Sequence, residues 1–480
     1  MTQHHDQLYI GGRWSAPSSD RRITVTSPNT GEVIGSVPEA MEADVDAAVA
    51  AARAAFDDPA GWAHSTPAER AAVMRRFADA LDARKEAMAT AVSSQNGMPI
   101  AMSSQVEAAF PGALLHYYAG LVENQADDVR DGMFGGTIRV RRDPIGVVGA
   151  IVPWNLPQTL AFFKIAPALA AGCTLVVKPS PETVFDSVLV AEAAIEAGMP
   201  AGVLNVVPAG REVGAHLVAH PGIDKVAFTG STAAGRWIAE TCGRLLRPVT
   251  LELGGKSAAL VLDDAELDLA TIGYDLFAAT LVNNGQACYL GTRILAPRSR
   301  YSEVVDVFSA FAGSMAVGDS LDPGTQIGPM TSERQRDRVE GYIAKGRAEG
   351  GRITVGGGRP SGRDAGWFVE PTVFADVDNN ATISQEEIFG PVLSVIAYED
   401  EADAIRIAND SDYGLGGTVW TADRERGIAV AEQIRSGNVG VNRFQPDPVA
   451  PYGGIKASGI GRELGPEGLA NYQHLKSVYC

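Results

Sequence analysis

The sequence predicts an α/β protein with largely parallel sheets. Short apolar runs alternate with helical stretches along most of the chain, and no repeat of fixed period or low-complexity segment interrupts them. The chain has 480 residues, of which 45% are hydrophobic and 20% charged, so it can bury large cores without disulfide staples. This length favours about two to four domains.

The charge and the polar N-terminus exclude several classes of protein. The formal net charge of -18 disfavours binding to nucleic acid and to anionic membrane surfaces. The first ten residues show no basic region followed by an apolar one, as a signal peptide would. The apolar run at 145–154 is too short to span a bilayer and is broken by Gly and Pro. We expect a cytoplasmic protein.

The cysteines are few and far apart: Cys173, Cys242, Cys288 and Cys480. No C-x-x-C pair or nearby histidine spacing suggests zinc, so no metal site is expected. So few cysteines do not form a disulfide framework either, and a reducing compartment fits them better.

The first part of the chain is expected to be helical. Apolar residues at three- and four-residue spacing predict helices over Ala43–Phe56 and Pro67–Ala89. Thr66, followed by a proline and then by Glu69, marks a helix start. Further along, Thr137–Arg142 alternates like a half-exposed strand after the glycine-rich turn Gly132–Gly136, which predicts a protruding hairpin.

The alternation of strands and helices is clearest between residues 145 and 262. The expected strands are Val147–Val152, Thr174–Lys178, Val203–Val207, Lys225–Thr229 and Ala258–Leu262, with helices such as Val184–Ala197 and Ala233–Thr241 between them. This doubly wound pattern is of the dinucleotide-binding type. A second α/β series follows over about residues 265–440, and Leu475–Tyr479 is expected as a short terminal strand.

The segment Phe228-Thr-Gly-Ser231 joins an expected strand to an expected helix. Its glycine allows close backbone approach, and the free N–H groups of the helix favour an anion. The alternative is a plain turn with Ser231 as helix cap. The usual G-x-G-x-x-G fingerprint is absent, because Leu464 stands where Gly459-Ile-Gly461 would need its third glycine.

Glu252 lies within a Leu-Glu-Leu strand end that leads into a Gly-Gly turn. The following Gly255-Lys-Ser257 imitates a phosphate-binding loop, but Thr250 occupies the position of its first glycine, so we reject that motif. A carboxylate between two leucines is partly desolvated, which raises its pKa toward the range of a general base. The alternative is an exposed glutamate on a strand edge.

Cys288 and Asn155 are candidates for the chemistry itself. Gly285 and Ala287 allow a tight turn that presents the thiol of Cys288 to a cleft; the alternative is a buried, inert cysteine. Asn155 follows an expected strand, where open α/β sheets bind ligands, and its amide can donate to an oxyanion; the alternative is a turn asparagine. Lys178 also ends an expected strand and is suited to a ribose or phosphate, or is simply solvated.

Each of these signals is weak alone, but their order and spacing are specific. The segments concerned are Pro153-Trp-Asn155, Lys178-Pro-Ser180, Phe228-Thr-Gly-Ser231, Glu252-Leu-Gly-Gly-Lys256, Gly285-Gln-Ala-Cys288, Glu386-Glu-Ile-Phe-Gly-Pro391, Pro451-Tyr-Gly-Gly-Ile-Lys456 and Ser458-Gly-Ile-Gly-Arg-Glu-Leu464. Together they resemble the aldehyde dehydrogenase superfamily, of the hydrolytic NAD(P)-dependent type, over nearly the whole chain.

The resemblance implies a mechanism. Cys288 is the nucleophile that carries a thioester, Asn155 and the Cys288 backbone N–H form the oxyanion hole, and Glu252 is the base for deacylation. For the cofactor, the implied residues are Trp154, Lys178, Ser180, Glu182, Gly230, Ser231, Glu387 and Phe389. In many members a Glu three residues after the ribose-binding Lys favours NAD, whereas here Pro181 stands there and Glu182 follows. We expect NAD, with NADP open.

The resemblance also implies a substrate tunnel and a division into parts. Leu156, Phe163, Tyr289 and Phe444 would line the tunnel and suit an apolar or aromatic aldehyde, although Leu156 and Phe163 also fit ordinary core packing. Arg443 and Asp447 in the same loop leave a polar substrate open. The expected parts are a cofactor domain (1–121 and 144–251), a catalytic domain (252–445) and an oligomerisation element (122–143 and 465–480), in a homodimer or homotetramer.

Three rival functions are a CoA-acylating dehydrogenase, a non-catalytic protein on the same fold, and a thiol esterase that needs no nicotinamide. Glu252 argues against the first, because a hydrolytic base serves deacylation by water. The joint presence of Cys288, Glu252 and Asn155 argues against the second. The natural aldehyde does not follow from the residues.

Overall fold

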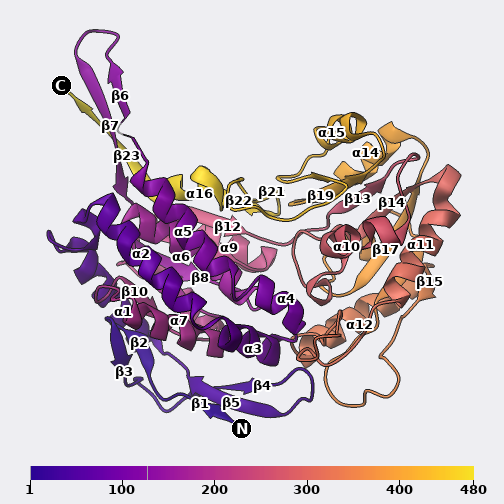
Figure 1. Cartoon of the computed structure of the whole chain (residues 1–480), viewed down its shortest axis with the longest axis horizontal. Coiled ribbons are helices and arrows are strands. Elements are labelled where there is room, and N and C mark those ends of the chain that lie inside the picture. Colours follow the sequence, from indigo (N-terminus) through magenta and orange to yellow (C-terminus); the bar gives the residue numbers. More distant parts are fainter. Residues whose placement is uncertain (1, 127) are drawn as a thin grey trace.

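A computed structural model describes residues 2–126 and 128–480. Its larger sheet has parallel strands at its centre and antiparallel strands at both ends (Figure 1). The eight strands follow the order β22 (Gly459–Ile460), β12 (Val249–Glu252), β11 (Lys225–Thr229), β8 (Val147–Ile151), β9 (Thr174–Lys178), β10 (Leu204–Val206), β2 (Leu8–Ile10) and β3 (Arg13–Ser15).

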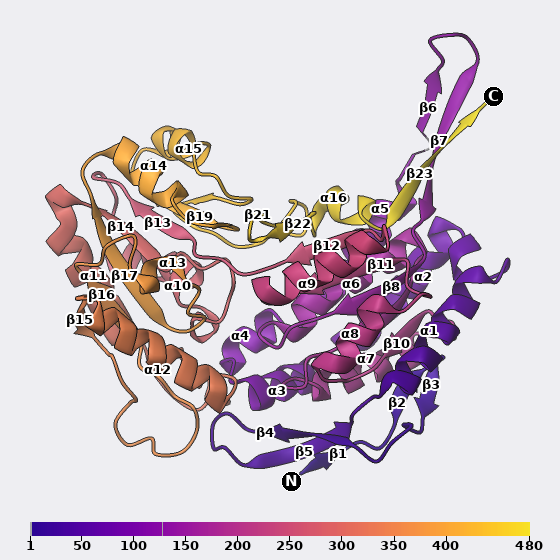
Figure 2. The same cartoon turned by 180° about the vertical axis from the view of Figure 1, so that it is seen from behind.

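Helices cover both faces of this sheet, because successive side chains of its buried strands point to opposite sides. In β8, Val148 and Ala150 face one apolar core, whereas Val147 and Ile151 face another. The helices of the first core are α2 (Pro67–Asp82), α3 (Lys85–Asn96), α5 (Phe110–Glu123), α6 (Pro157–Ala171) and α7 (Phe185–Glu196). Those of the second are α1 (Glu42–Asp57), α8 (Arg211–Ala219) and α9 (Thr232–Arg244), seen in front in Figure 2.

A second sheet forms the other half of the molecule, on the right in Figure 1. Its seven strands follow the order β15 (Arg352–Val355), β16 (Thr372–Ala375), β17 (Val392–Tyr398), β14 (Arg293–Pro297), β13 (Ala258–Val261), β19 (Gly417–Trp420) and β20 (Gly440–Val441), with only β15 antiparallel to its neighbour. The helices that pack on it are α10 (Leu269–Thr280), α11 (Tyr301–Gly313), α12 (Glu333–Ala348), α13 (Thr382–Gln385), α14 (Glu401–Asn409) and α15 (Arg424–Ala431).

Three small sheets complete the fold. One contains β1 (Gln3–His4), β5 (Val33–Pro38) and β4 (Arg22–Thr26), and another pairs β18 (Tyr413–Gly414) with β21 (Ile455–Lys456). The third protrudes from the body and contains β23 (Gln473–Tyr479), β7 (Thr137–Pro144) and β6 (Asp128–Asp131) (Figures 1 and 2). The short helices α4 (Ile100–Gln105) and α16 (Gly465–Ala470) lie in connections.

Most of the expected elements are present, and two expectations were wrong. The expected strand Ala258–Leu262 belongs to the second sheet, where β13 pairs with β14 and β19, and not to the dinucleotide-binding pattern. Local apolar character cannot show this, because it does not say which neighbour a strand pairs with. From β12 the chain crosses directly to the second sheet, so we propose the domain division at Glu252.

The expected helix Pro67–Ala89 is two helices. The start at Thr66 is confirmed, because its hydroxyl accepts from the Glu69 amide at 3.2 Å while the Glu69 carboxylate accepts from the Thr66 amide at 2.7 Å. The first of them, α2, ends at Asp82. There the Arg84 guanidinium donates to the Ala80 carbonyl at 2.8 Å, and the Arg84 amide donates to the Leu81 carbonyl in place of it. The apolar periodicity continues through this break and hides it.

Within the described residues, no helix combines the length and apolar character that crossing a membrane requires. The predicted hairpin is confirmed as β6 and β7, and β23 extends it by an edge strand. Leu475 and Tyr479 on β23 are 71% and 78% exposed. Because exposed apolar residues on an edge strand mark a contact with another chain, we propose this sheet as the oligomerisation element.

We expect Leu475→Asp to lower the molar mass of the protein in light scattering, because a charge on the edge strand is costly to bury between subunits. Val33→Asp is a matched control, since Val33 is also apolar and exposed, at 53%, but lies on the small N-terminal sheet. An unchanged mass for Leu475→Asp would contradict the proposed contact.

Candidate active site

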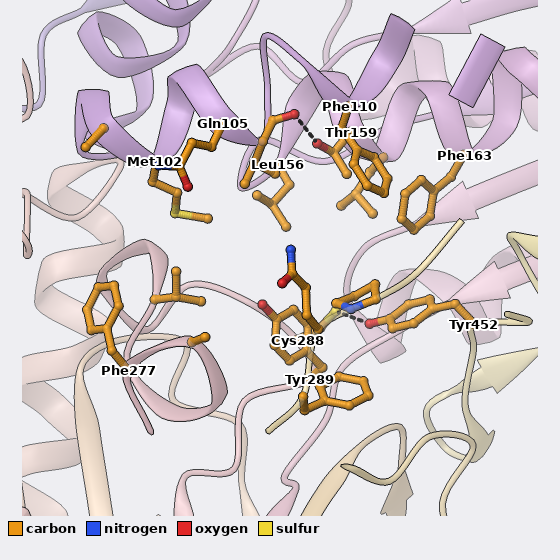
Figure 3. Close-up of a pocket in the computed structure, with 18 of the residues that line it drawn as sticks. Met102, Gln105, Phe110, Leu156, Thr159, Phe163, Phe277, Cys288, Tyr289 and Tyr452 are labelled. Carbon is orange, nitrogen blue, oxygen red and sulfur yellow. Dashed lines mark hydrogen bonds between the residues drawn. The ribbon is translucent and has the colours of Figure 1, made fainter. Parts of the chain in front are cut away.

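Cys288 lies at the junction of two cavities between the two halves of the molecule. It belongs to the loop that follows the 3-10 turn Asn283–Gly285 and precedes β14. The first cavity, of about 420 Å³, is lined by Pro153, Trp154, Asn155, Thr229, Gly230, Ser231, Leu253, Gly254, Cys288, Arg334, Gln335, Arg338, Glu387 and Phe389. The second, of about 290 Å³, also has Cys288 in its lining and is shown in Figure 3.

The second cavity is mostly apolar. Predicted tunnel residues Leu156, Phe163, Tyr289 and Phe444 all line it, together with Ala101, Met102, Gln105, Val106, Phe110, Thr159, Leu160, Tyr274, Phe277, Ala278, Val282, Gln445, Pro446 and Tyr452. Aromatic rings pack edge to face around it, with Tyr289 against Phe444 at 5.2 Å between centroids. Arg443 and Asp447, which could have contacted a polar substrate, are not among the described residues that line this cavity.

The Cys288 loop has an unusual backbone that its sequence permits. Asn283 and Asn284 both adopt positive φ, of 54° and 60°, and Gly285 follows at 73°. Asn284 fixes the loop by donating from Nδ2 to the Gly97 carbonyl at 2.9 Å and accepting from the Gly328 amide at 2.7 Å. A side chain on Gly285 would lie 2.3 Å from the Gly390 carbonyl group, so only glycine fits there.

Asn155 and the Cys288 loop are joined by reciprocal hydrogen bonds. The Asn155 amide donates from Nδ2 to the Gln286 carbonyl at 2.9 Å, and Asn283 donates from Nδ2 to the Asn155 carbonyl at 2.9 Å. Asn96 adds donations to the carbonyls of Trp154 and Asn155 at 3.0 and 3.1 Å. Asn155 is 3% exposed and lines the first cavity. The Gln286 carbonyl accepts one of its two amide hydrogens, which leaves the second without an acceptor among the described residues.

The surroundings of the Cys288 thiol disfavour its ionisation. Burial raises its pKa to about 12, and the nearby carboxyls of Glu387 and Glu252 raise it further. A hydrogen bond opposes this shift: the sulfur lies 3.3 Å from the Tyr452 hydroxyl. A nucleophilic thiolate at this position therefore needs local donors.

Glu252 ends β12 and is buried at 2% exposure, so the alternative of an exposed edge residue is wrong. Both of its carboxylate oxygens lack a hydrogen-bond partner among the described residues. Burial, and secondly the nearby Glu463, raise the pKa of Glu252 well above its usual range. Glu463 in turn pairs with the fully buried Lys164 at 2.7 Å, and Lys164 also donates to the Thr229 hydroxyl at 2.6 Å.

The first cavity brings together five of the predicted cofactor residues. The rings of Trp154 and Phe389 meet edge to face at 5.3 Å, and Phe389 adopts a strained φ of 63°. The Glu387 carboxylate accepts from the Gly255 amide at 2.9 Å, while burial raises the pKa of Glu387. Gly230 and Ser231 stand at the start of α9, where Ser231 caps the helix by accepting from the Ala234 amide at 3.3 Å.

Three predicted cofactor residues lie outside the lining of this cavity. Lys178 is 6% exposed and donates to the carbonyls of Pro179 and Ala209 at 2.9 and 2.8 Å, and burial lowers its pKa to about 8. The Ser180 hydroxyl donates to Glu182 at 2.5 Å. Glu182 also pairs with Arg334, a lining residue, at 3.3 Å, which places it at the edge of the cavity.

Comparison with known proteins decides the family. The model of the aldehyde dehydrogenase family matches residues 14–478. The chain belongs to this family. It is 56% identical over 480 residues to a geranial dehydrogenase of Castellaniella defragrans, covering 100% of this chain and 99% of the relative. It is 40% identical over 474 residues to a 3-succinoylsemialdehyde-pyridine dehydrogenase of a Pseudomonas species, covering 98% of each.

Solved aldehyde dehydrogenase structures agree with the fold. The enzyme of Mycobacterium tuberculosis complexed with NAD+ matches with a TM-score of 0.97 at 50% identity, covering 100% of this chain and 99% of that chain. A mutant of aldehyde dehydrogenase C of Pseudomonas syringae, complexed with NAD+ and octanal, matches with a TM-score of 0.95 at 39% identity. The match covers 100% of this chain and 99% of that chain. The predicted family and fold class are therefore confirmed.

Sequence reasoning missed several residues of this aldehyde dehydrogenase site. Tyr452 stood within a quoted motif, but a motif does not show where a hydroxyl points. Lys164 and Glu463 are 299 positions apart, so their pairing could not be read from the sequence. Arg334, Gln335 and Arg338 lie on α12 and line the first cavity. The local sign of this helix in the sequence is Ser332, which caps its start.

One aspartate and two histidines form a cluster on the surface. The ligand-type atoms of Asp46, His216 and His220 lie within 4.8 Å of one another. The Gly222 amide donates to His220 Nδ1 at 3.0 Å, and an Asp46 oxygen lies 2.6 Å from His216 Nε2 and 3.3 Å from His220 Nε2. These contacts describe a hydrogen-bonded group.

We expect Gly285→Ala to destabilise the protein by about 1–3 kcal/mol and to slow alkylation of Cys288, because the new carbon clashes with Gly390 and shifts the loop. Thermal unfolding and the iodoacetamide rate measure the two effects. Gly273→Ala is the control: Gly273 lies within α10 with open space around it, so the change stabilises by up to about 1 kcal/mol. Equal behaviour of the two variants would contradict the packing argument.

Proposed function

We propose that this aldehyde dehydrogenase oxidises apolar aldehydes to carboxylic acids, with NAD as hydride acceptor and water as second substrate. One observation carries the proposal: Cys288 separates an apolar cavity suited to an aldehyde chain from a cavity that contains the N-terminus of α9. An aldehyde bound in the apolar cavity presents its carbonyl carbon to the sulfur.

The first chemical step is attack by the Cys288 thiolate on that carbon. A sulfur–carbon bond forms, and the carbonyl electrons move to oxygen. The free hydrogen of Asn155 Nδ2 and the backbone N–H of Cys288 serve as donors to this oxyanion. Because the Gln286 carbonyl already fixes the Asn155 amide, the donor needs no reorganisation. The tetrahedral carbon then releases hydride, and an acyl group remains on sulfur as a thioester.

The second step is hydrolysis, for which Glu252 is the proposed base. Its carboxyl is buried without partners and its pKa is raised, which suits proton transfer near neutral pH. In the deprotonated form it takes a proton from water, whose oxygen attacks the thioester carbon. The sulfur–carbon bond breaks, and the acid leaves. Lys164, which pairs with Glu463, opposes this rise in the pKa of Glu252.

The first cavity fits a nicotinamide cofactor, which supplies a two-electron acceptor when bound. The start of α9 offers free N–H groups and a partial positive charge to a pyrophosphate. Glu387 is placed to hold a ribose, and the Trp154–Phe389 pair offers apolar walls. Lys178, Ser180 and Glu182 are proposed for the adenosine end. We propose NAD because two related structures are NAD+ complexes and because Glu182 disfavours an added phosphate.

The proposed substrate class rests on the second cavity and on relatives. Phe110, Leu156, Leu160 and Phe277 offer the aldehyde chain hydrophobic contact. One relative acts on geranial by its name, and another was solved with octanal. Both aldehydes are apolar chains of a kind that such walls accept.

We expect Cys288→Ala to abolish NADH formation and Asn155→Ala to lower kcat by about a hundred- to a thousandfold, since one of two oxyanion donors is lost. Absorbance at 340 nm with aliphatic, aromatic and charged aldehydes, and with NAD and NADP side by side, measures both effects. Turnover that survives in Cys288→Ala would mean that the nucleophile is another group.

Along a series of straight-chain aldehydes, we expect kcat/KM to rise by up to about fourfold per methylene until the cavity is filled, because each buried methylene contributes about 0.8 kcal/mol. Met102→Glu should flatten this rise by placing a charge in the cavity wall, whereas the matched Met102→Leu should keep it. A series without chain-length dependence, or a preference for charged aldehydes, would contradict the substrate class.

A further inference from the structure

The Tyr452 hydroxyl is the hydrogen-bond partner of the Cys288 sulfur among the described side chains. The two atoms lie 3.3 Å apart, within the range for a bond to sulfur. Tyr452 is 3% exposed, and Figure 3 shows its ring directed toward Cys288 across the edge of the apolar cavity. The contact joins residues 164 positions apart, so the fold and not the local chain creates it.

The fold holds this phenol in a fixed place. Tyr452 and Glu463 exchange backbone hydrogen bonds in both directions, each at 2.7 Å. The ring packs edge to face against Phe163 at 6.0 Å between centroids. A hydroxyl supported in this way meets the sulfur in one geometry, at little further entropic cost.

The direction of the hydrogen bond follows from the chemistry of the two groups. A phenol is ordinarily less acidic than a thiol. Burial, and then the nearby Cys288, raise the pKa of Tyr452 well above its usual range, which also favours the protonated phenol. A thiolate has no proton to donate, and the tyrosine O–H becomes the donor. Hydrogen bonds to a charged acceptor are stronger than those between neutral groups.

We propose that Tyr452 is a catalytic residue whose hydroxyl donates to the Cys288 sulfur and thereby stabilises the attacking thiolate. The role in aldehyde oxidation rests on the proposed function. In the step itself, the thiol proton passes to solvent, the sulfur–carbon bond forms, and the tyrosine proton stays on its oxygen. The bond weakens once sulfur becomes a neutral thioether, so Tyr452 acts before and during attack.

The test is the rate of Cys288 alkylation by iodoacetamide between pH 6 and 10, with neither aldehyde nor cofactor present. We expect Tyr452→Phe to shift this profile toward higher pH by about one unit, a tenfold loss of thiolate at a given pH. The thiolate of the variant is more basic and therefore a stronger nucleophile, which offsets part of this loss, so the observed rate falls by about threefold to tenfold. Mass spectrometry identifies the alkylated residue, since Cys480 is exposed and Cys288 is only partly so.

Tyr472→Phe is the matched control, because it removes a buried hydroxyl that has no hydrogen-bond partner among the described residues and lines neither cavity. Its alkylation profile should stay unchanged. Should Tyr452→Phe fail to fold, 3-fluorotyrosine at position 452, a stronger donor of similar shape, should shift the profile toward lower pH.

An unchanged or faster profile in Tyr452→Phe would overturn the proposal, since a faster one means that the phenol holds the thiol proton in place. Alkylation needs no aldehyde, so this readout stays informative even if the protein oxidises none. If aldehyde oxidation holds, kcat/KM of Tyr452→Phe should fall in step with the alkylation rate, with KM little changed.

Discussion

The exchange of hydrogen bonds between Asn155 and the Cys288 loop is the constraint on which the site depends. Asn155 follows a strand of one sheet, and Cys288 precedes a strand of the other. Each amide is buried, so a small separation of the halves would leave donors and carbonyls without partners, at about 1–3 kcal/mol for each. The two halves therefore have one relative position near the sulfur, and both cavities take their shape from it.

Burial of the same centre sets its electrostatics. The groups around the sulfur include Glu252 and Glu387, and burial raises the pKa of both as well as that of Cys288. Burial away from water favours the protonated form of an acid and strengthens the interaction of nearby dipoles with a charge. In the proposed mechanism, reactivity therefore depends on hydrogen-bond donors that lie where negative charge develops. The fixed backbone of the Cys288 loop holds such donors in place without movement.

The sequence predicted the elements better than their partners. Apolar runs located β9 and β11 to the residue, because a strand buried on both faces is apolar along its whole length. The same signal placed Ala258–Leu262 in the wrong sheet, since pairing is decided by long-range contacts. At the site, order and spacing identified Cys288, Asn155 and Glu252 as candidates. The burial of Glu252 and the orientation of the Tyr452 hydroxyl depend on segments far away in the chain.

In the proposed mechanism, the position of Cys288 between two unlike cavities also sets where each reactant binds. The aldehyde chain would enter from the apolar side, and the hydride acceptor would bind on the side of α9. The carbon attached to sulfur must therefore direct its hydrogen into the first cavity, beside α9. Its chain stays in the second, apolar cavity. Water for hydrolysis has to reach the same face of that carbon, because the apolar side is filled by the chain. In this proposal hydrolysis follows hydride transfer, because only the loss of hydride creates the thioester carbonyl that water attacks.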